Sequence, residues 1–595
     1  MSVRFGEWTF GLDGADIPGR DVIGGKAWSV ARLLALGLTA PPAFVVTTRA
    51  CAAYMASGAL PAGLEGELAA GVAWLESCAE RSFGRGPRPL LVSVRSGAPI
   101  SMPGMMDTVL NLGVNDAAEA ALAAECGDAR FARDTHRRFL DLYAQIVLKQ
   151  GASPLAADGD PTQWRAAIAG GGGSVPQDPM AQLRGAVAAV FESWNSRRAR
   201  RYRQHHGIAD ALGTAVTVQA MVFGNADDCS GTGVLFTRNP LTGEPLPYGE
   251  YLPRAQGEDV VSGKFTPKPL SVMRETVPAA HEALLKAAHT LEQAARDVQD
   301  IEFTVERGKL YFLQTRSAKL APQAAVRIAV DLANEGLIDE AAALARVTPE
   351  QVRLLLSPHL TEEAIRGGDL AAQGEGASPG VGIGIIVGDS DEAERRAKSG
   401  ETVVLARATT SPDDLHGMIA ARAVITEQGG STSHAAVVGR ALGLPCVVGC
   451  GPGSLAGLAG ETVTVDGRTG KVYRGALAIA NPDESANKLL ARLTQWAAAR
   501  SPLKVVSVAG APETDIVDLT GDEAAADPAR IGEALARHSG ARGARGGAIG
   551  SPEGVRAAIA AGLSFIVADP VLPALLAAVR AGIADTPLVA EKERA

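Results

Sequence analysis

Two short β-rich runs, residues 301–305 and 310–314, flank a four-residue segment, Glu-Arg-Gly-Lys, at residues 306–309. Runs of this kind, joined by a short segment that contains glycine, are typical of a β-hairpin. Side chains two positions apart on a strand point to the same face of the sheet. The hairpin therefore predicts one polar face, which carries two carboxylates, an amide oxygen and a guanidinium: Asp300, Glu302, Gln314 and Arg316.

This polar face has two interpretations. Oxygen ligands beside a guanidinium that can hold a phosphate in a bidentate manner are what magnesium–nucleotide chemistry requires. The alternative is a solvated sheet face that is held by ordinary salt bridges. The hairpin alone does not choose between them.

A second segment, residues 426–440 (TEQGGSTSHAAVVGR), joins a strand end, two glycines and three hydroxyl residues to a small-residue helix that begins at His434. Glycine lets a backbone approach a ligand closely, and a helix N-terminus offers free N–H donors to an anion. A neutral imidazole at this point is suited to accept a phosphoryl group covalently. The alternative is a histidine with ordinary loop hydrogen bonds. Thr432 or Ser433 is the predicted N-cap of the helix.

Three shorter segments place a basic residue beside glycine or at a strand end. Lys26 follows two glycines, but the spacing is not that of a P-loop, and a plain turn is the alternative. Arg95 ends a predicted strand, residues 90–94, where it contacts either a phosphate or a surface carboxylate. Arg238, after the predicted strand 233–237, is a further candidate for a phosphate contact.

Length and pattern predict several domains of mixed α/β and α+β class. The 595 residues correspond to about four domains of ordinary size. We divide the chain into a nucleotide-binding domain, a helical linker, an α/β domain around His434 and a short βα module, at residues 1–330, 331–376, 377–500 and 501–595. The Gly- and Ala-rich residues 151–177 are predicted to be a flexible insertion, and the Gly/Pro-rich residues 367–382 a hinge.

Within the last two segments the pattern predicts alternating strands and helices. The α/β domain is expected to end in a helix at residues 482–500, with Asn481 as its N-cap. The short module is expected to have three strands, at residues 504–508, 546–550 and 563–567.

Composition and charge exclude several classes of function. The net charge of −9, from 57 Lys and Arg against 66 Asp and Glu, argues against a general nucleic-acid binder. No segment reaches the about 18 uninterrupted apolar residues that a membrane span needs, and the N-terminus lacks the apolar core of a signal peptide. The 6 cysteines are scattered, and the spaced pair Cys446 and Cys450 is interpreted as buried thiols rather than a metal site. We therefore expect a cytoplasmic protein without nucleic-acid or membrane partners.

Taken together, these segments resemble the pyruvate phosphate dikinase family of PEP-utilising enzymes, from about residue 10 to about residue 473. The resemblance rests on long motifs, which include IGGKAWSVARLLALGL, LLVSVRSGAPISMPGMMDTVLNLGVND, VQAMVFGNADDCSGTGVLFTRNP, QDIEFTVERGKLYFLQTR and GGSTSHAAVVGR. Phosphoenolpyruvate synthase and the rifampin phosphotransferases share the general plan. The SMPGMMDTVLNLG stretch is similar to the dikinase in particular.

The resemblance implies an ATP-grasp nucleotide-binding domain, a swivelling phosphohistidine domain and a C-terminal barrel for phosphoenolpyruvate and pyruvate. It implies that ATP and Mg2+ are bound by Lys26, Arg95, Asp300, Glu302, Gln314 and Arg316, with Glu302 and Gln314 as the metal ligands. His434 would accept the phosphoryl group through a pyrophospho-histidine that inorganic phosphate then cleaves. Thr432 stands where plant members carry a regulatory phosphothreonine, and its role as an N-cap is sufficient to explain it in this chain.

The chain departs from the family after residue 500. Residues 501–595 are too few for a (β/α)8 barrel, which needs about 250 residues. Residues 546–556 and 561–570 resemble the end of that barrel, but Ala568 stands where the family has a catalytic cysteine. The tail is therefore interpreted as a reduced barrel remnant, and the alternative is an unrelated βα module.

The predicted function is that of a dikinase-like phosphotransferase, which uses ATP and inorganic phosphate to phosphorylate His434. Onward transfer to pyruvate or another acceptor would need a separate barrel protein, or a homodimer in which the tail is completed. The alternative is a non-catalytic ATP-binding regulatory paralogue that has kept the fold.

Overall fold

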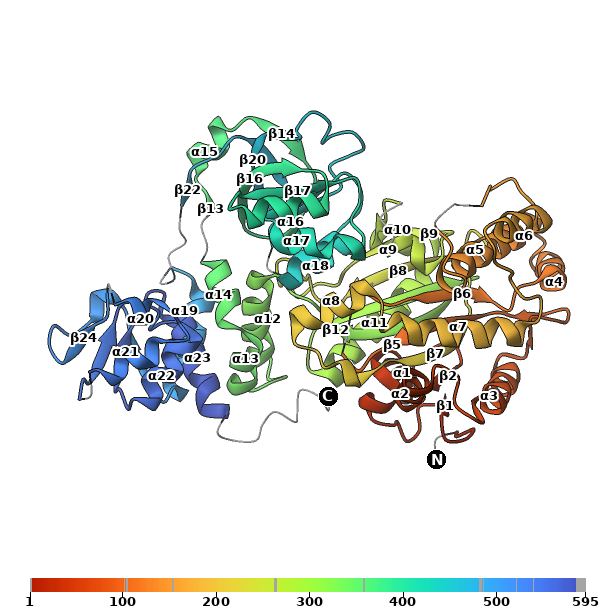
Figure 1. Cartoon of the computed structure of the whole chain (residues 1–595), viewed down its shortest axis with the longest axis horizontal. Coiled ribbons are helices and arrows are strands. Elements are labelled where there is room, and N and C mark those ends of the chain that lie inside the picture. Colours follow the sequence, from red (N-terminus) through yellow and green to blue (C-terminus); the bar gives the residue numbers. More distant parts are fainter. Residues whose placement is uncertain are drawn as a thin grey trace.

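We analysed a computed structural model of the chain, which consists of three bodies (Figure 1). It describes residues 3–584 except 101, 103–104, 152–154, 262–264, 357–358, 443, 481–483, 485, 521 and 539. We call the bodies the N-terminal unit (residues 9–317), the histidine unit (370–474) and the C-terminal unit (322–355 with 488–584). No helix among the described residues combines the length and the apolar character that crossing a membrane would take.

Two five-stranded sheets form the N-terminal unit. The first has the strand order β1 (Thr9–Leu12), β2 (Ala43–Val46), β7 (Ala215–Ala220), β5 (Val92–Gly97) and β6 (Thr108–Leu112). The second has the order β10 (Lys268–Pro269), β9 (Tyr248–Pro253), β8 (Gly231–Phe236), β11 (Gln299–Glu306) and β12 (Lys309–Ser317). The helices are α1 (Arg20–Ala35), α2 (Thr48–Ser57), α3 (Leu64–Ala79), α4 (Asp116–Cys126), α5 (Ala129–Ile146), α6 (Pro161–Gly170), α7 (Pro179–Ser193), α8 (Arg197–His206), α9 (Gly257–Val261), α10 (Leu270–Thr276) and α11 (Pro278–Ala295).

The predicted hairpin is confirmed as β11 and β12. Asp300 lies opposite Arg316, and Glu302 lies opposite Gln314. In the turn, Arg307 and Gly308 have φ angles of 50° and 79°, the left-handed conformation that a two-residue hairpin turn of this kind requires at both positions. A register shift after Glu302 leaves this pairing intact.

Helix α1 reaches the first sheet through a kink at Gly24. This residue has φ 73° and ψ 164° inside the helix, and a Cβ atom there would lie 1.8 Å from the carbonyl oxygen of Gly97. The next residue, Gly25, donates its N–H to the carbonyl of Ala98 at 2.9 Å. Only glycine permits this close approach, which sets Lys26 beside the carboxyl end of β5.

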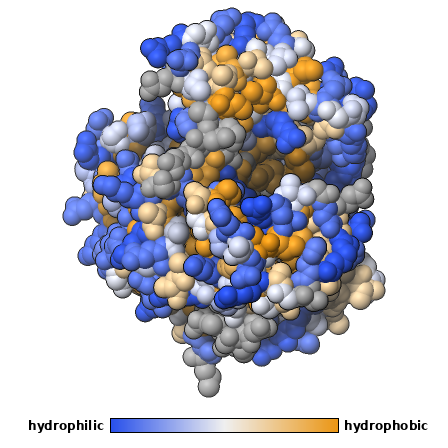
Figure 2. All heavy atoms as spheres, turned by 90° about the vertical axis from the view of Figure 1, so that its left-hand side faces the viewer, coloured by the Kyte–Doolittle hydropathy of each residue, from blue (hydrophilic) through white to orange (hydrophobic). Residues whose placement is uncertain are grey.

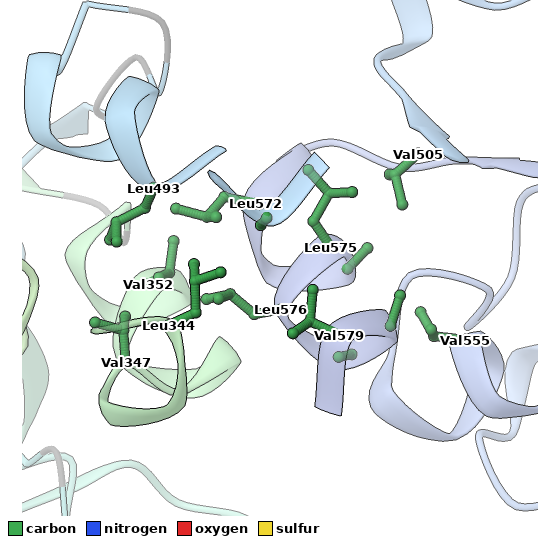
Figure 3. Packing of buried hydrophobic residues seen from close by; sticks show 14 of the residues in the cluster. Leu344, Val347, Val352, Leu493, Val505, Val555, Leu572, Leu575, Leu576 and Val579 are labelled. Carbon is green, nitrogen blue, oxygen red and sulfur yellow. The ribbon is translucent and has the colours of Figure 1, made fainter. Parts of the chain in front are cut away.

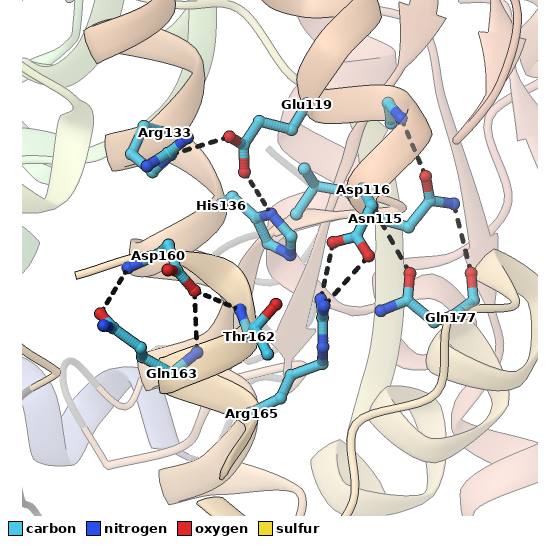
Figure 4. A network of polar contacts seen from close by, with 12 residues as sticks. Asn115, Asp116, Glu119, Arg133, His136, Asp160, Thr162, Gln163, Arg165 and Gln177 are labelled. Atoms are coloured by element: carbon cyan, nitrogen blue, oxygen red, sulfur yellow. Dashed lines mark hydrogen bonds and ion pairs between the residues drawn. The ribbon is translucent and has the colours of Figure 1, made fainter. Parts of the chain in front are cut away.

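Residues 151–177 are not a flexible insertion, and this prediction was wrong where the structure describes them. They contain helix α6, which begins with a capping box between Asp160 and Gln163 (Figure 4). Trp164 is 2 % exposed, donates to the carbonyl of Ala156 at 2.9 Å and packs edge-on against His136. The glycine run concealed a short helix that is held by one large buried side chain.

We expect Trp164→Ala to lower the free energy of unfolding of the N-terminal unit by about 3–5 kcal/mol, because it empties a buried site of tryptophan size. Urea unfolding followed by circular dichroism would measure the change. Thr162→Ala, at an exposed position of the same helix, is the matched control and should change stability little. Equal stability of the two variants would contradict the packing role.

The histidine unit is built on one sheet. Its strand order is β14 (Leu370–Gln373), β21 (Lys471–Arg474), β20 (Thr462–Asp466), β16 (Val381–Val387), β17 (Val403–Arg407), β18 (Ala423–Thr426), β19 (Cys446–Val448) and β15 (Glu375–Ser378). The two outermost strands, β14 and β15, are separated in the chain by Gly374 alone. The sheet therefore closes on itself as a barrel. Helices α16 (Ser390–Lys398), α17 (Leu415–Ala420) and α18 (His434–Leu442) accompany it.

Closure of this barrel overturns the prediction of a hinge at residues 367–382. Residues 370–373, 375–378 and 381–387 are strands of the barrel. A Cβ atom on Gly374 would lie 2.3 Å from the carbonyl oxygen of Val448, so the glycine serves close strand approach. The Gly-rich composition reflects packing here rather than freedom of movement.

One hydrophobic core joins segments that we had predicted to lie in three different domains. Helices α12 (Pro322–Asn334), α13 (Glu340–Arg346) and α14 (Pro349–Leu355) pack with α19 (Lys488–Arg500) and α23 (Val571–Ala584). Figure 3 shows Leu344 and Val352 facing Leu493, Leu572 and Leu576 across this core. The predicted helical linker is thus part of the C-terminal unit.

The remainder of the C-terminal unit is a small parallel sheet with the order β23 (Lys504–Val506), β26 (Phe565–Val567), β25 (Gly543–Arg545) and β24 (Ile516–Asp518). Its helices are α20 (Glu523–Ala526), α21 (Ile531–Ala536), α22 (Pro552–Ala560) and α23. The strand predicted at residues 546–550 lies instead at residues 543–545, and β24 was not predicted. Helix α19 begins at Lys488 with Asn487 as its N-cap, while Asn481 lies outside the described residues.

The chain passes twice between the C-terminal unit and the histidine unit. The two passages meet as the short antiparallel strands β13 (His359–Leu360) and β22 (Ile479–Ala480). Helix α15 (Glu362–Gly367) follows the first passage. The predicted hinge after Tyr473 therefore corresponds to one of two paired connections.

Candidate functional site

The hairpin face carries a compact set of opposite charges. Arg316 Nε donates to Asp300 Oδ2 at 2.8 Å, and its Nη2 lies 3.5 Å from Glu302 Oε1. From the other sheet, Arg95 Nη2 on β5 donates to Glu302 Oε2 at 3.2 Å. The structure thus brings the predicted residues of both sheets together at one place.

Two buried oxygens at this face lack hydrogen-bond partners. They are Asp300 Oδ1 and Gln314 Oε1, on side chains that are 6 % and 7 % exposed. A buried acceptor without a partner is costly unless a ligand or ion satisfies it. Together with the neighbouring carboxylate of Glu302, these oxygens fit a hard cation such as Mg2+, which prefers oxygen ligands. No group of three His, Cys, Asp or Glu side chains suited to a metal occurs among the described residues, so an amide oxygen is needed to complete such a set.

The charges of this face shift one another's pKa values. Burial raises the pKa of Asp300, although the positive charges of Arg316 and Arg440 oppose the shift. Burial also acts to raise the pKa of Glu302, but Arg316, Arg95 and Lys26 outweigh it, so that its pKa is lowered. Glu302 is therefore a stable carboxylate.

Lys26 is the titratable cation of the site. Its burial, and then the positive charge of Arg95, lower the pKa of Lys26 to about 7, although Glu302 opposes the shift. Without a ligand the ammonium group is thus only partly charged at neutral pH. A bound phosphate would restore the charge, because an anion favours the protonated form.

We expect the affinity for ATP to fall as the pH rises above about 7, because Lys26 then loses the proton that an anionic ligand requires. Below this pH the lysine is already charged and contributes no further dependence. Calorimetric titration of ATP in buffers with different heats of ionisation would detect the proton that is taken up. Lys26→Arg stays charged and should bind without proton uptake; the same uptake in this variant would assign the titration to another group.

His434 opens helix α18, as predicted from the sequence. Its Nδ1 lies 3.2 Å from the hydroxyl of Thr410, and its buried Nε2 has no hydrogen-bond partner. Burial lowers the pKa of His434 to about 4, although the carboxylates of Asp414 and Asp413 act to raise it. The imidazole is therefore neutral at physiological pH, and with the proton on Nδ1 its Nε2 lone pair is free to act as a nucleophile.

The hydroxyl residues before His434 do not cap the helix with their side chains. Thr432 donates instead to Glu250 Oε2 at 2.6 Å, and Ser431 donates to Glu250 Oε1 at 3.0 Å. The hydroxyl of Ser433 has no hydrogen-bond partner. The side-chain capping predicted for Thr432 and Ser433 is therefore wrong, because a carboxylate of the N-terminal unit is the acceptor for Thr432.

Sequence reasoning missed the residues that receive this loop. Tyr248 and Glu250 lie on β9, and the Tyr248 hydroxyl donates to Glu375 of the histidine unit at 2.7 Å. Ser431 N–H donates to the second oxygen of Glu375 at 3.1 Å. The spacing of Tyr248 and Glu250 indicated a shared strand face, but nothing local showed what that face would contact.

The histidine unit is therefore docked on the N-terminal unit. A buried apolar cluster includes Met102 and Met105 from one unit and Ala435 and Ala436 of α18 from the other. Arg440, also on α18, donates to the carbonyls of Ser431 and Ala377 at 2.8 and 3.0 Å. Its positive charge acts on Asp300 across the interface.

Arg238 does not face this site. Its guanidinium is 4 % exposed and is bound by Glu292 and Glu335 at 2.8 and 2.6 Å. The phosphate contact suggested for Arg238 is therefore wrong, because two carboxylates already neutralise it.

Comparison with known proteins agrees with this geometry. Residues 61–282 match the family model of the pyruvate phosphate dikinase AMP/ATP-binding domain, and residues 399–470 match that of the PEP-utilising enzyme mobile domain. Pyruvate, phosphate dikinase of Rhizobium meliloti (strain 1021) is 42% identical over 555 residues, which cover 85% of this chain and 61% of the relative.

Two further relatives have similar scores. Pyruvate, phosphate dikinase of Clostridium symbiosum is 41% identical over 544 residues, covering 85% of this chain and 62% of the relative. Pyruvate, phosphate dikinase 2 of Zea mays is 42% identical over 530 residues, covering 83% and 60%. The chain thus spans about three fifths of the length of these curated relatives. With the nucleotide face, the histidine and both domain models on one chain, this protein belongs to the pyruvate phosphate dikinase family.

Proposed function

We propose that this chain is a phosphotransferase that uses ATP and inorganic phosphate to phosphorylate its own His434. The observation that carries the proposal is the state of this side chain: a neutral imidazole with an unpartnered Nε2, at the start of α18 in a unit docked beside the hairpin face. A solitary structural histidine would be expected to have both ring nitrogens satisfied.

In this proposal each charged residue of the face has a part in holding the nucleotide. Lys26, Arg95 and Arg316 bind the phosphates, and Asp300, Glu302 and Gln314 offer oxygens to Mg2+, with Glu302 and Gln314 as its direct ligands. The metal, when bound, would neutralise charge on the phosphates. His434 Nε2 forms the new bond to phosphorus while the Nδ1 proton stays with Thr410, which keeps the imidazole in the required tautomer.

The family precedent divides the transfer in two. A pyrophosphoryl group moves first to His434, and inorganic phosphate then removes the terminal phosphoryl group. Binding of the donor and delivery to an acceptor require the histidine unit to leave the docked position. We propose the paired connections β13 and β22 as the hinge for this movement.

Transfer to pyruvate is not expected from this chain by itself. Enolate chemistry needs a proton donor in an enclosed pocket. The described part of the C-terminal unit offers four strands, and Ala568 follows the last of them where the family has its catalytic cysteine. A coupled assay for phosphoenolpyruvate should give no product with the chain alone and product when a free barrel domain is added. Product from the chain alone would show that the acceptor site is present.

Labelled ATP tests the proposal directly. With Mg2+ and ATP labelled at the β-phosphate, we expect acid-labile, base-stable label to remain on the protein. With ATP labelled at the γ-phosphate, the label should be lost when inorganic phosphate is added. If the protein binds ATP but takes up neither label, it is a regulatory ATP-binding paralogue instead.

A further inference from the structure

The parallel sheet of the C-terminal unit has all its helices on one face. Strands β24, β25 and β26 follow one another in the chain and in the sheet, and right-handed crossovers then place every connecting helix on the same side. The packing agrees, because Val505, Ala544 and Ile566 lie in one core with the helices. The opposite face is thus left without a layer, whereas parallel sheets are ordinarily covered on both.

The uncovered face is apolar at its centre and charged at its margins. Phe565 lies over Gly543, where a Cβ atom would be 2.2 Å from the ring, and Val506 and Ile516 on the two outer strands are partly exposed. The connection between β23 and β24, residues 507–515, contains no buried residue, and Val508 within it is 65 % exposed. This connection therefore does not serve as the missing layer.

Both edges of the sheet are open as well. Among the described residues, neither β23 nor β24 has a partner strand on its outer side. The first strand of the unit, β23, pairs with the last, β26, which is the closure pattern of a βα barrel. Four strands are too few to close, since such a barrel has about eight. Figure 1 places β24 at the end of the molecule away from the N-terminal unit, and Figure 2, which looks onto that end, shows apolar surface exposed among hydrophilic surface.

We propose that this face binds a second copy of the chain, so that two four-stranded halves close one eight-stranded parallel barrel around a two-fold axis. A rotation about the barrel axis keeps all strands parallel, and it sets β23 of each copy beside β24 of the other. Both open edges are then paired at once, and the two uncovered faces become one interior. An unrelated strand would satisfy one edge only.

The charges at the two edges are complementary in this arrangement. Lys504, which begins β23, is exposed and has no ion pair among the described residues. Glu513 and Asp515, both exposed, immediately precede β24. Parallel pairing brings the start of β23 in one copy next to the start of β24 in the other, so each lysine meets carboxylates.

The mass of the full chain in solution is the first test. Sedimentation or light scattering over a concentration series should give about twice 61.2 kDa for the natural sequence. Ile516→Asp, which places a charge on the open face at the edge of β24, should give the single-chain mass at concentrations where the natural chain is paired. Ile419→Asp, at a 40 % exposed position of α17, is the matched control and should stay paired.

Cross-linking then tests which edges meet. In a background in which the exposed Cys78 and Cys229 are replaced by Ser, chains with Lys504→Cys are mixed with chains with Ile516→Cys under oxidation. Only the mixture should form disulfide-linked pairs. Within one chain these positions lie on opposite edges, about 14 Å apart at three strand spacings, which is too far for a disulfide.

A single-chain mass throughout the series would overturn the proposal. So would a pair that survives Ile516→Asp, or a mixture without cross-links, because the copies would then meet elsewhere. Circular dichroism of each variant checks that the unit is folded. None of these readouts depends on ATP, so they succeed or fail independently of the phosphotransfer proposed above.

Discussion

His434→Ala is expected to abolish labelling of the protein by ATP completely. The variant removes the only atom that we assign as phosphoryl acceptor, and alanine offers no replacement. Because His434 Nε2 makes no hydrogen bond, its removal should leave the stability of the histidine unit nearly unchanged. The measurement is acid-labile label per chain after incubation with ATP and Mg2+, alongside the melting temperature of both proteins.

The control for this experiment lies in the same unit. His416 on α17 pairs with Asp391 at 2.9 Å, away from the proposed chemistry, and His416→Ala should retain full labelling. Equal label on the natural chain and the His434→Ala variant would place the acceptor at another residue. ATP binding should be unaffected in both variants, because neither histidine belongs to the N-terminal unit.

Glu302→Ala and Gln314→Ala should each slow phosphoryl transfer by about 100-fold or more, because each removes a proposed oxygen ligand from the phosphate-binding face. Gln314→Ala is the sharper of the two, since its Oε1 makes no hydrogen bond whose loss would disturb the fold. The rate of label uptake measures the effect. Urea unfolding should show that both variants remain folded.

Glu306→Ala is the matched control, because Glu306 lies at the hairpin end of the same strand as Glu302. It should transfer label at the natural rate. If all three variants are slowed alike, the hairpin as a whole is needed and no ligand role follows. Natural rates in Glu302→Ala and Gln314→Ala would remove the assignment of this face to nucleotide.

The sequence was most informative where the constraint is local. The alternation of Asp300 and Glu302, the turn at Gly308 and the helix start at His434 depend on neighbours a few residues away, and all three appear in the structure. Local pattern also misled. Glycine-rich residues near α6 suggested freedom, whereas the burial of Trp164 is decided by a helix that precedes it in the chain.

Contacts between distant segments were beyond such reasoning. Glu250 and Thr432 are 182 residues apart, yet they form one of the shortest hydrogen bonds of the interface. The closure of the histidine barrel likewise depends on Gly374 standing between two strands whose partners lie far along the chain. Each of these features requires a global arrangement that no window of sequence contains.

The paired connections β13 and β22 impose a geometric condition on whatever receives the phosphoryl group. A body fastened along one line, as a door is by its hinge pin, can only sweep an arc, and the radius of that arc is the distance from the pin to the imidazole. An acceptor on this arc experiences a high effective concentration of the donor, whereas one off the arc experiences almost none. Any catalytic partner must therefore present its pocket at that radius, and its orientation is selected before any contact is made.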